Sequence, residues 1–169
     1  GSLAGAGNVT LVGNLGTGFN NTSTTYSGII QGTGSLFKGG SGTFGLGGTN
    51  TFTGDTNELA GVLQLQGGTA LLDTGIVSIS NGATLDLAAS ETIGTLTGAG
   101  NVTLNAFTLT AGASNGTSTF TGPIQGTGGR IKVGTGVLTL SGTNVFSGPT
   151  TVNAGTLSLA GGAALSDLT

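Results

Sequence analysis

The sequence contains no cysteine, histidine, methionine or tryptophan, and only 5% of its 169 residues are charged. Without cysteine and histidine it excludes disulfides, the usual zinc sites, and the Ser-His-Asp and Cys-His nucleophiles of hydrolases. Lys38, Arg130 and Lys132 are its only basic residues, too few for the clustered positive charge that nucleic-acid binding requires. No run of about 18 apolar residues could span a membrane as a helix.

Glycine is abundant, with 37 residues, whereas proline occurs only twice. The glycines do not recur at every third position, so the sequence is not collagen-like. Disorder accompanies low hydrophobicity and high net charge. Here 36% of the residues are hydrophobic, the mean hydropathy is +0.32 and the formal net charge is only -3. We therefore expect the chain to fold.

The chain repeats itself with a step of about 94 residues. The segment from Leu3 to Leu11 returns from Leu96 to Leu104, and Gly48-Thr49-Asn50 returns as Gly142-Thr143-Asn144. Self-similarity at a fixed period is typical of repeat architectures, in which each unit packs on its neighbours.

Within each unit, short segments begin with glycine and then alternate apolar with small polar residues. They run from Gly61 to Leu65, Gly82 to Leu87, Gly100 to Leu104, Gly136 to Leu140 and Gly155 to Leu159. A period of two predicts a strand with one buried face, and the turn-forming residues between the segments predict frequent corners. No segment has the period of an amphipathic helix.

The spacing of these segments predicts a parallel β-helix, a chain that coils with one rung per turn. We expect roughly five turns of about 19 residues in each unit and roughly nine coils in the chain, a rod about 40 Å long. Phe52 and Phe146 should occupy equivalent interior places, and Asn50 and Asn144 suit corners or hydrogen bonds to the neighbouring backbone. An antiparallel sandwich is the alternative, because dipeptides such as Asn81-Gly82 favour tight hairpins.

We interpret residues 1–169 as a single β-solenoid segment of a longer array. One repeat unit covers residues 3–93, and a second, incomplete unit covers 96–169. An array that is cut within a unit leaves a terminal coil without a neighbouring coil. We therefore expect the native polypeptide to be longer, or copies of the chain to stack end to end.

The stretch from Gly134 to Leu159 resembles the passenger-associated β-strand repeat of bacterial autotransporters, and the flanking segments resemble the linking parts of such arrays. The resemblance implies a right-handed parallel β-helix within a passenger that is exported by a Gram-negative bacterium and displayed on its surface or released. The family's translocator barrel is not in this sequence. The first unit departs from the pattern where Asp55, Asn57 and Glu58 replace Pro149, Thr151 and Val152, which predicts a polar face on that coil.

Candidate catalytic chemistry rests on six carboxylates. Glycosidase action needs two of them across a cleft, and the nearest pairs are Asp55 with Glu58 and Asp86 with Glu91. Neither pair lies in an aromatic-rich stretch, so we expect all six to be solvated corner or face residues and the protein not to be an enzyme. The six are Asp55, Glu58, Asp73, Asp86, Glu91 and Asp167.

Two glycine patterns resemble ligand-binding motifs. The stretch from Gly40 to Gly45 has the spacing of a phosphate-binding loop, but no helix pattern follows it, so we expect a coil corner. Calcium-binding repeats need an aspartate closer to the glycine pair than Asp73 is to Gly67-Gly68 or Asp167 is to Gly161-Gly162. We expect both aspartates in turns. We therefore predict no catalytic residues, no metal site and no cofactor.

Three functions fit these observations. The first is a rigid stalk or fibre segment of a surface-displayed or secreted adhesin, whose partners are neighbouring repeats and host-cell or matrix surfaces. The second is an extracellular filament in which the open coil ends of separate copies pair. The third is a solenoid that binds or processes carbohydrate. Nucleic acid and a direct membrane span are not expected.

Overall fold

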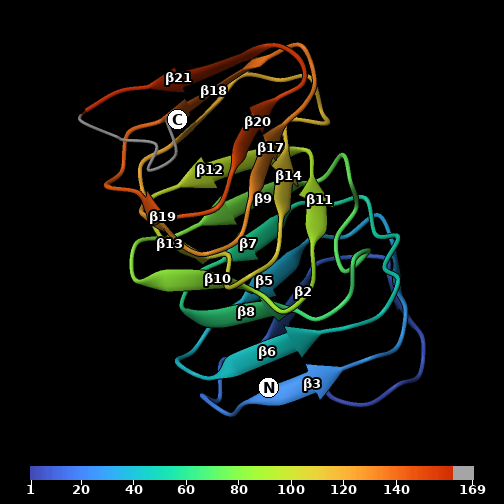
Figure 1. The fold of residues 1–169 in the computed structure, drawn as a ribbon. Helices are drawn as coiled ribbons and strands as arrows, with labels where there is room; N and C mark the ends of the chain where they lie inside the picture. Colours follow the sequence, from blue (N-terminus) through green and yellow to red (C-terminus); the bar gives the residue numbers. More distant parts are fainter. Residues whose placement is uncertain (162–169) are drawn as a thin grey trace.

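In the computed structural model, which describes residues 1–161, the alternating segments form 21 short strands, and that part of the chain contains no helix. The strands are arranged in successive coils of about 20 residues, so that Leu36 pairs with Leu15 of one neighbouring coil and with Thr56 of the other. The coils stack into a β-solenoid with three faces (Figure 1). Residues 1–161 include no helix long and apolar enough to cross a membrane.

The first face is an eight-stranded sheet, here called sheet I. Its order is β2 (Leu15–Thr17), β5 (Leu36–Lys38), β7 (Thr56–Glu58), β9 (Ile76–Ile79), β12 (Thr95–Gly98), β15 (Ser118–Phe120), β18 (Val137–Leu140) and β21 (Thr156–Leu159). The seven strands of the second face, sheet II, follow the order β19 (Val145–Phe146), β16 (Ile124–Gly126), β13 (Asn101–Thr103), β10 (Ala83–Leu87), β8 (Gly61–Leu65), β6 (Thr43–Leu46) and β3 (Thr24–Tyr26).

The third face, face III, is interrupted in its middle. It contains the pair β1 (Val9–Leu11) and β4 (Ile30–Gly32), then the sheet β11 (Glu91–Ile93), β14 (Leu109–Ala111), β17 (Arg130–Lys132) and β20 (Thr150–Val152). Residues 51–53 follow β4 on this face, because the amide groups of Thr51 and Thr53 donate to the carbonyls of Ile30 and Gly32. The paired strands of all three faces are parallel, which excludes the antiparallel sandwich.

The hydrophobic core is the interior of the coils. Alternation turns every second side chain inward, and the parallel register places inward residues of successive coils above one another. Leu36, Leu63, Leu85 and Ile93 have no exposed surface. Full burial of each such side chain contributes about 2 kcal/mol, so the stack of inward residues is the main source of stability.

The sequence repeat does not correspond to a whole number of coils. β5 lies in sheet I, but its counterpart one unit later, β17, lies on face III. In the same way β6 of sheet II returns as β18 of sheet I, and β4 of face III returns as β16 of sheet II. One unit therefore spans four full coils and two faces of a fifth, and each unit is rotated by one face relative to the unit before it.

The predicted β-solenoid is confirmed, and the values expected for its coils are close to those observed: a unit spans slightly fewer than five turns. The described residues form eight coils, as the eight strands of sheet I show, with about 20 residues in each. Phe52 and Phe146 are both buried, as expected, but Phe146 belongs to sheet II whereas Phe52 lies on face III.

Asparagine side chains hold the corners before face III and sheet II. Asn50 is buried, and its Oδ1 accepts the Ile30 amide at 2.7 Å while its Nδ2 donates to the carbonyls of Gly48 and Ala70 at 3.0 and 2.8 Å. Asn144, its counterpart, accepts the Ile124 amide at 3.1 Å, and its Nδ2 has no partner among the described residues. The expected hydrogen bonds to neighbouring backbone are therefore confirmed.

We predict that Asn50→Ala lowers the free energy of unfolding by about 3 kcal/mol, because a buried amide and two buried carbonyls lose their partners. Asn144→Ala is the matched control and should lower it by about 1 kcal/mol, because one hydrogen bond is lost. Urea denaturation followed by circular dichroism measures both. Equal losses would contradict this account of the corner.

Candidate functional site

Most charged side chains of this protein lie inside the coils. All three basic residues are buried, and so are two of the acids, with exposed fractions of 0 to 7%: Lys38, Glu58, Glu91, Arg130 and Lys132. Register explains their position, because Lys38 follows the inward Leu36 by two residues and pairs with Glu58 of the next coil. The outer surface of the described residues therefore carries no basic side chain.

The lysine corner is a structure that occurs once in each unit. Nζ of Lys38 donates to the carbonyls of Gly39 and Gly40 in its own coil, at 3.0 and 3.1 Å, and to the carbonyl of Ala60 in the next coil, at 2.7 Å. Such hydrogen bonds from an ammonium are stronger than those between neutral groups. Because one of the three crosses to the next coil, the corner ties two coils together.

The second lysine corner repeats the first, position for position. Nζ of Lys132 donates to the carbonyls of Val133, Gly134 and Ala154. The residue after Ala154, Gly155, has a φ of +67°, and a Cβ there would overlap the Gly134 carbonyl and crowd Nζ. Glycine is therefore required where the chain closes over the ammonium.

Glu58 is buried beside the first lysine corner without hydrogen bonds of its own. It has no exposed surface, and neither carboxylate oxygen has a partner among the described residues. Burial raises the pKa of Glu58 to about 8, and the nearby Lys38 ammonium lowers it only in part. Burial therefore favours the uncharged carboxylic acid. The second unit has Val152 at this position.

Glu91 supports the interrupted part of face III. Its two carboxylate oxygens accept the amides of Ala70 and Leu71 from the preceding coil, at 3.1 and 3.2 Å. Burial raises the pKa of Glu91 to about 7, against the lowering effect of these two hydrogen bonds. The side chain takes the place of a missing strand partner, which is a structural role.

The remaining described acids lie on the outside. Asp55 and Asp73 are exposed, and Asp73 lies in a turn, as expected. Asp86 faces outward from β10 and accepts hydrogen bonds from Gln64 Nε2 at 2.8 Å and Asn105 Nδ2 at 2.9 Å. This row of polar side chains crosses three successive coils.

The two candidate catalytic pairs are not formed. Glu58 and Glu91 are buried, whereas Asp55 is exposed and Asp86 faces outward. The expectation that all six acids are solvated is therefore wrong for Glu58 and Glu91, because their register turns them inward. The polar face predicted for that coil is also only partial, since Asp55 and Asn57 remain outside the core. Asp167 lies outside the described residues, which hold no metal-ligand group of three acids.

The glycine stretch from Gly40 to Gly45 begins with a corner, as predicted, and its last three residues belong to strand β6. Gly40 has a φ of +69°, and the chain continues directly into strand β6. No helix begins there, so the amide groups of a phosphate-binding helix terminus are missing from this corner.

The buried basic residues were not predicted, although the sequence contained a signal for them. Lys38 occurs two residues after Leu36, and Lys132 two residues after Arg130, in segments that alternate like the other strands. The same alternation that places leucines inside therefore indicates inward lysines, and the return of Lys38 as Lys132 indicates a fixed structural role.

Parts of the chain match known proteins. The family model described as passenger-associated-transport-repeat matches residues 36–65 and 131–159, and each matched stretch contains one lysine corner or most of it. The chain is also 41% identical over 99 residues to the Adhesin BmaC autotransporter of Brucella suis biovar 1 (strain 1330). That match covers 59% of this chain but only 3% of the Brucella protein. No solved structure matches the chain.

We predict that Glu58→Val stabilises the protein by about 2 kcal/mol at pH 7, because it removes a buried acid that lacks hydrogen-bond partners. The pKa of Glu58 is higher in the folded chain, at about 8, than its ordinary value of 4.5. Its contribution to stability is therefore greatest below pH 4.5 and is lost as the pH rises to 8. The advantage of Glu58→Val should grow over this range, as urea denaturation at several pH values would show.

Two further observations sharpen this test. The pKa of Glu91 is also raised, to about 7. The Glu58→Val variant should therefore still lose some stability as the pH rises to about 7, but less than the wild type. Asp55→Asn, which changes an exposed acid, is the control and should leave the pH dependence unaltered. A stability difference between wild type and Glu58→Val that is the same at pH 5 and pH 8 would refute the buried-acid interpretation.

We also predict that Lys38→Met lowers the free energy of unfolding by about 3 kcal/mol, because three carbonyls at the corner lose their donor. Lys132→Met tests the same corner in the second unit, where no acid is paired with the lysine. Similar losses in the two variants mean that the ammonium acts through the carbonyls. A loss confined to Lys38→Met would mean that it acts through Glu58 instead.

Proposed function

From the premise that this chain is an autotransporter passenger repeat segment, we propose that it forms a rigid stalk of a surface-displayed or secreted adhesin of a Gram-negative bacterium. The two passenger-associated-transport-repeat matches and the similarity to the Brucella adhesin support this proposal. The chain spans only a small part of that relative, so adhesion by the whole protein, its export through the outer membrane and its place on the cell surface belong to the proposal.

The observation that carries the proposal is the continuous stacking of coils. Eight coils with a spacing of about 4.8 Å extend about 40 Å, and each further repeat unit adds about 22 Å without changing the cross-section. In such a solenoid each coil contacts only its neighbours, so length can be extended without designing a new core. Length and stiffness are what a stalk must provide.

The surface supports a passive role for this segment. Its basic residues are buried, and the outward acids are few and spread over different coils. The acids within residues 1–161 do not form a pair across a cleft, so a non-enzymatic role is favoured over carbohydrate processing. The direct partners of the segment are the neighbouring repeats, and host-cell or matrix surfaces are contacted by other parts of the adhesin.

We predict that the chain scatters X-rays as a rod and that inserted copies of residues 36–129 lengthen it by about 22 Å each. The insertion joins equivalent positions, since Arg130 is the counterpart of Leu36. Small-angle scattering of chains with no, one and two inserted copies should give a constant cross-section and a length that rises in equal steps. A cross-section that grows with each copy would contradict the stalk.

The same series distinguishes the other functions. Binding to host cells or matrix that increases with copy number would assign adhesion to the repeat itself. Fibres that form as the concentration rises, seen by sedimentation, would favour assembly of copies end to end.

A further inference from the structure

Arg130 is a buried cation whose hydrogen-bonding capacity is only partly used. It is 7% exposed, its guanidinium lies 3.6 Å above the centre of the Phe146 ring, and its Nη2 donates to Oγ1 of Thr150 at 3.0 Å. Its Nε and Nη1 have no partner among the described residues. Leu36 occupies the equivalent position in the first unit, so this cation belongs to the second unit alone.

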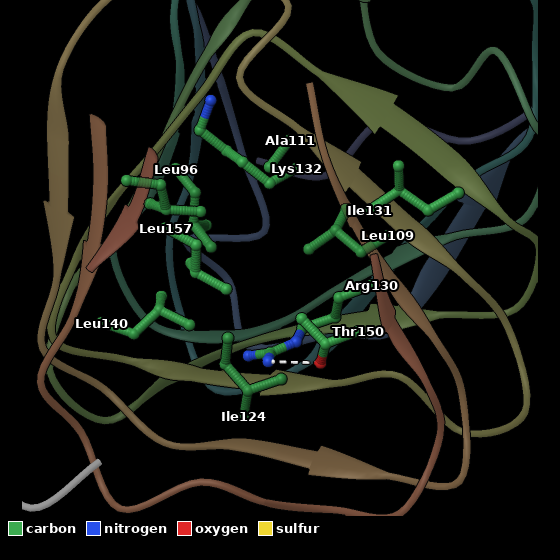
Figure 2. A pocket seen from close by; sticks show the side chains of 11 residues that line it. Leu96, Leu109, Ala111, Ile124, Arg130, Ile131, Lys132, Leu140, Thr150 and Leu157 are labelled. Atoms are coloured by element: carbon green, nitrogen blue, oxygen red, sulfur yellow. Dashed lines mark hydrogen bonds between the residues drawn. The ribbon is translucent and has the colours of Figure 1, made fainter. Parts of the chain in front are cut away.

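The Arg130 side chain lies at a cavity inside the coils. The cavity has a volume of about 20 Å³, and aliphatic side chains from all three faces line it, among them Leu96, Leu109, Ile124 and Leu140. Figure 2 shows the guanidinium extending across the coil interior, between Ile124 and Thr150. A space of this size holds one particle as large as a water molecule or slightly larger.

The charge of Arg130 is not neutralised by the described residues. Burial lowers its pKa to about 10, which leaves the side chain charged at neutral pH. The sequence has no aspartate or glutamate between Glu91 and Asp167. Lys132, which lies two residues away, adds a second buried positive charge instead. A buried charge without a partner is strongly unfavourable, so a counter-charge would stabilise Arg130.

We propose that this cavity binds a small monovalent anion the size of chloride, which accepts a hydrogen bond from Nε or Nη1 of Arg130. The cavity is too small for a polyatomic anion such as sulfate. A water molecule could satisfy the same donor, but it leaves the positive charge in the apolar interior. The anion ties β17 to the coil interior, where Phe146 and Thr150 already hold the other parts of the guanidinium.

Bromide is the probe for the site because it replaces chloride and scatters X-rays anomalously. Crystals of the chain grown in sodium bromide should show an anomalous peak within hydrogen-bond distance of Arg130 Nε or Nη1. Arg130→Leu, which installs the residue of the first unit, should fold and lose the peak. A wild-type cavity that is empty or holds only water would overturn the proposal.

Solution measurements provide a second test. With chloride above its dissociation constant, each tenfold increase should raise the unfolding midpoint of the wild type by about 4 °C. Sodium gluconate at the same ionic strength serves as the control, since gluconate is too large for the cavity. Arg130→Leu should respond equally to the two salts. A wild type that also responds equally to them would refute anion binding.

Asp167 is the remaining source of negative charge in the second unit, and it lies outside the described residues. Asp167→Asn distinguishes it from a free anion. The proposal predicts that this variant keeps both the bromide peak and the chloride response. If the wild type shows no bromide peak and Asp167→Asn lowers the unfolding midpoint as much as loss of an ion pair would, the aspartate is the counter-charge and the proposal is wrong.

Discussion

The parallel hydrogen-bond ladders between successive coils are the interaction on which the rest of this structure depends. Each coil contacts only the coils beside it, so every buried polar group must find its partners within that short distance. Asn50 and Lys38 do so by bonding carbonyls of their own coil and of the next. Glu58 and Arg130 are the exceptions, because the neighbouring coils do not supply hydrogen-bond partners for all of their buried polar atoms.

The rotation of the repeat by one face follows from the same ladders. All three faces show the same alternation of inward and outward residues, so a segment that forms a strand in sheet I can form one equally well on face III. A unit therefore does not need to fill a whole number of coils. Corresponding outward residues of successive units lie on each of the three faces in turn. They return to the first face only after three units. A stalk built in this way has no single uniform side for a partner.

The class of the fold was predictable because its signals are local. A period of two and glycine at the corners appear within a few residues, and the recurrence of Gly48-Thr49-Asn50 reveals the array. The number of coils was not predictable, because the distance between the alternating segments varies. The face on which each segment lies also depends on the whole path of the chain. Glu58 and Glu91 were misjudged because charge was taken as evidence of exposure, although their register indicated the interior.

Buried charge also bears on how such a repetitive chain finds its register. Successive coils present similar leucines and small polar residues, so packing alone discriminates poorly between a correct pairing and one shifted along the chain. A shift by one residue would turn Lys38 outward and leave the carbonyls of Gly39, Gly40 and Ala60 without a donor. A shift by a whole coil would replace Ala60 by a residue whose corner does not accommodate an ammonium. The lysine corner therefore disfavours pairing shifted by one residue and pairing shifted by one coil. Because the corner returns at Lys132, each repeat unit contains one.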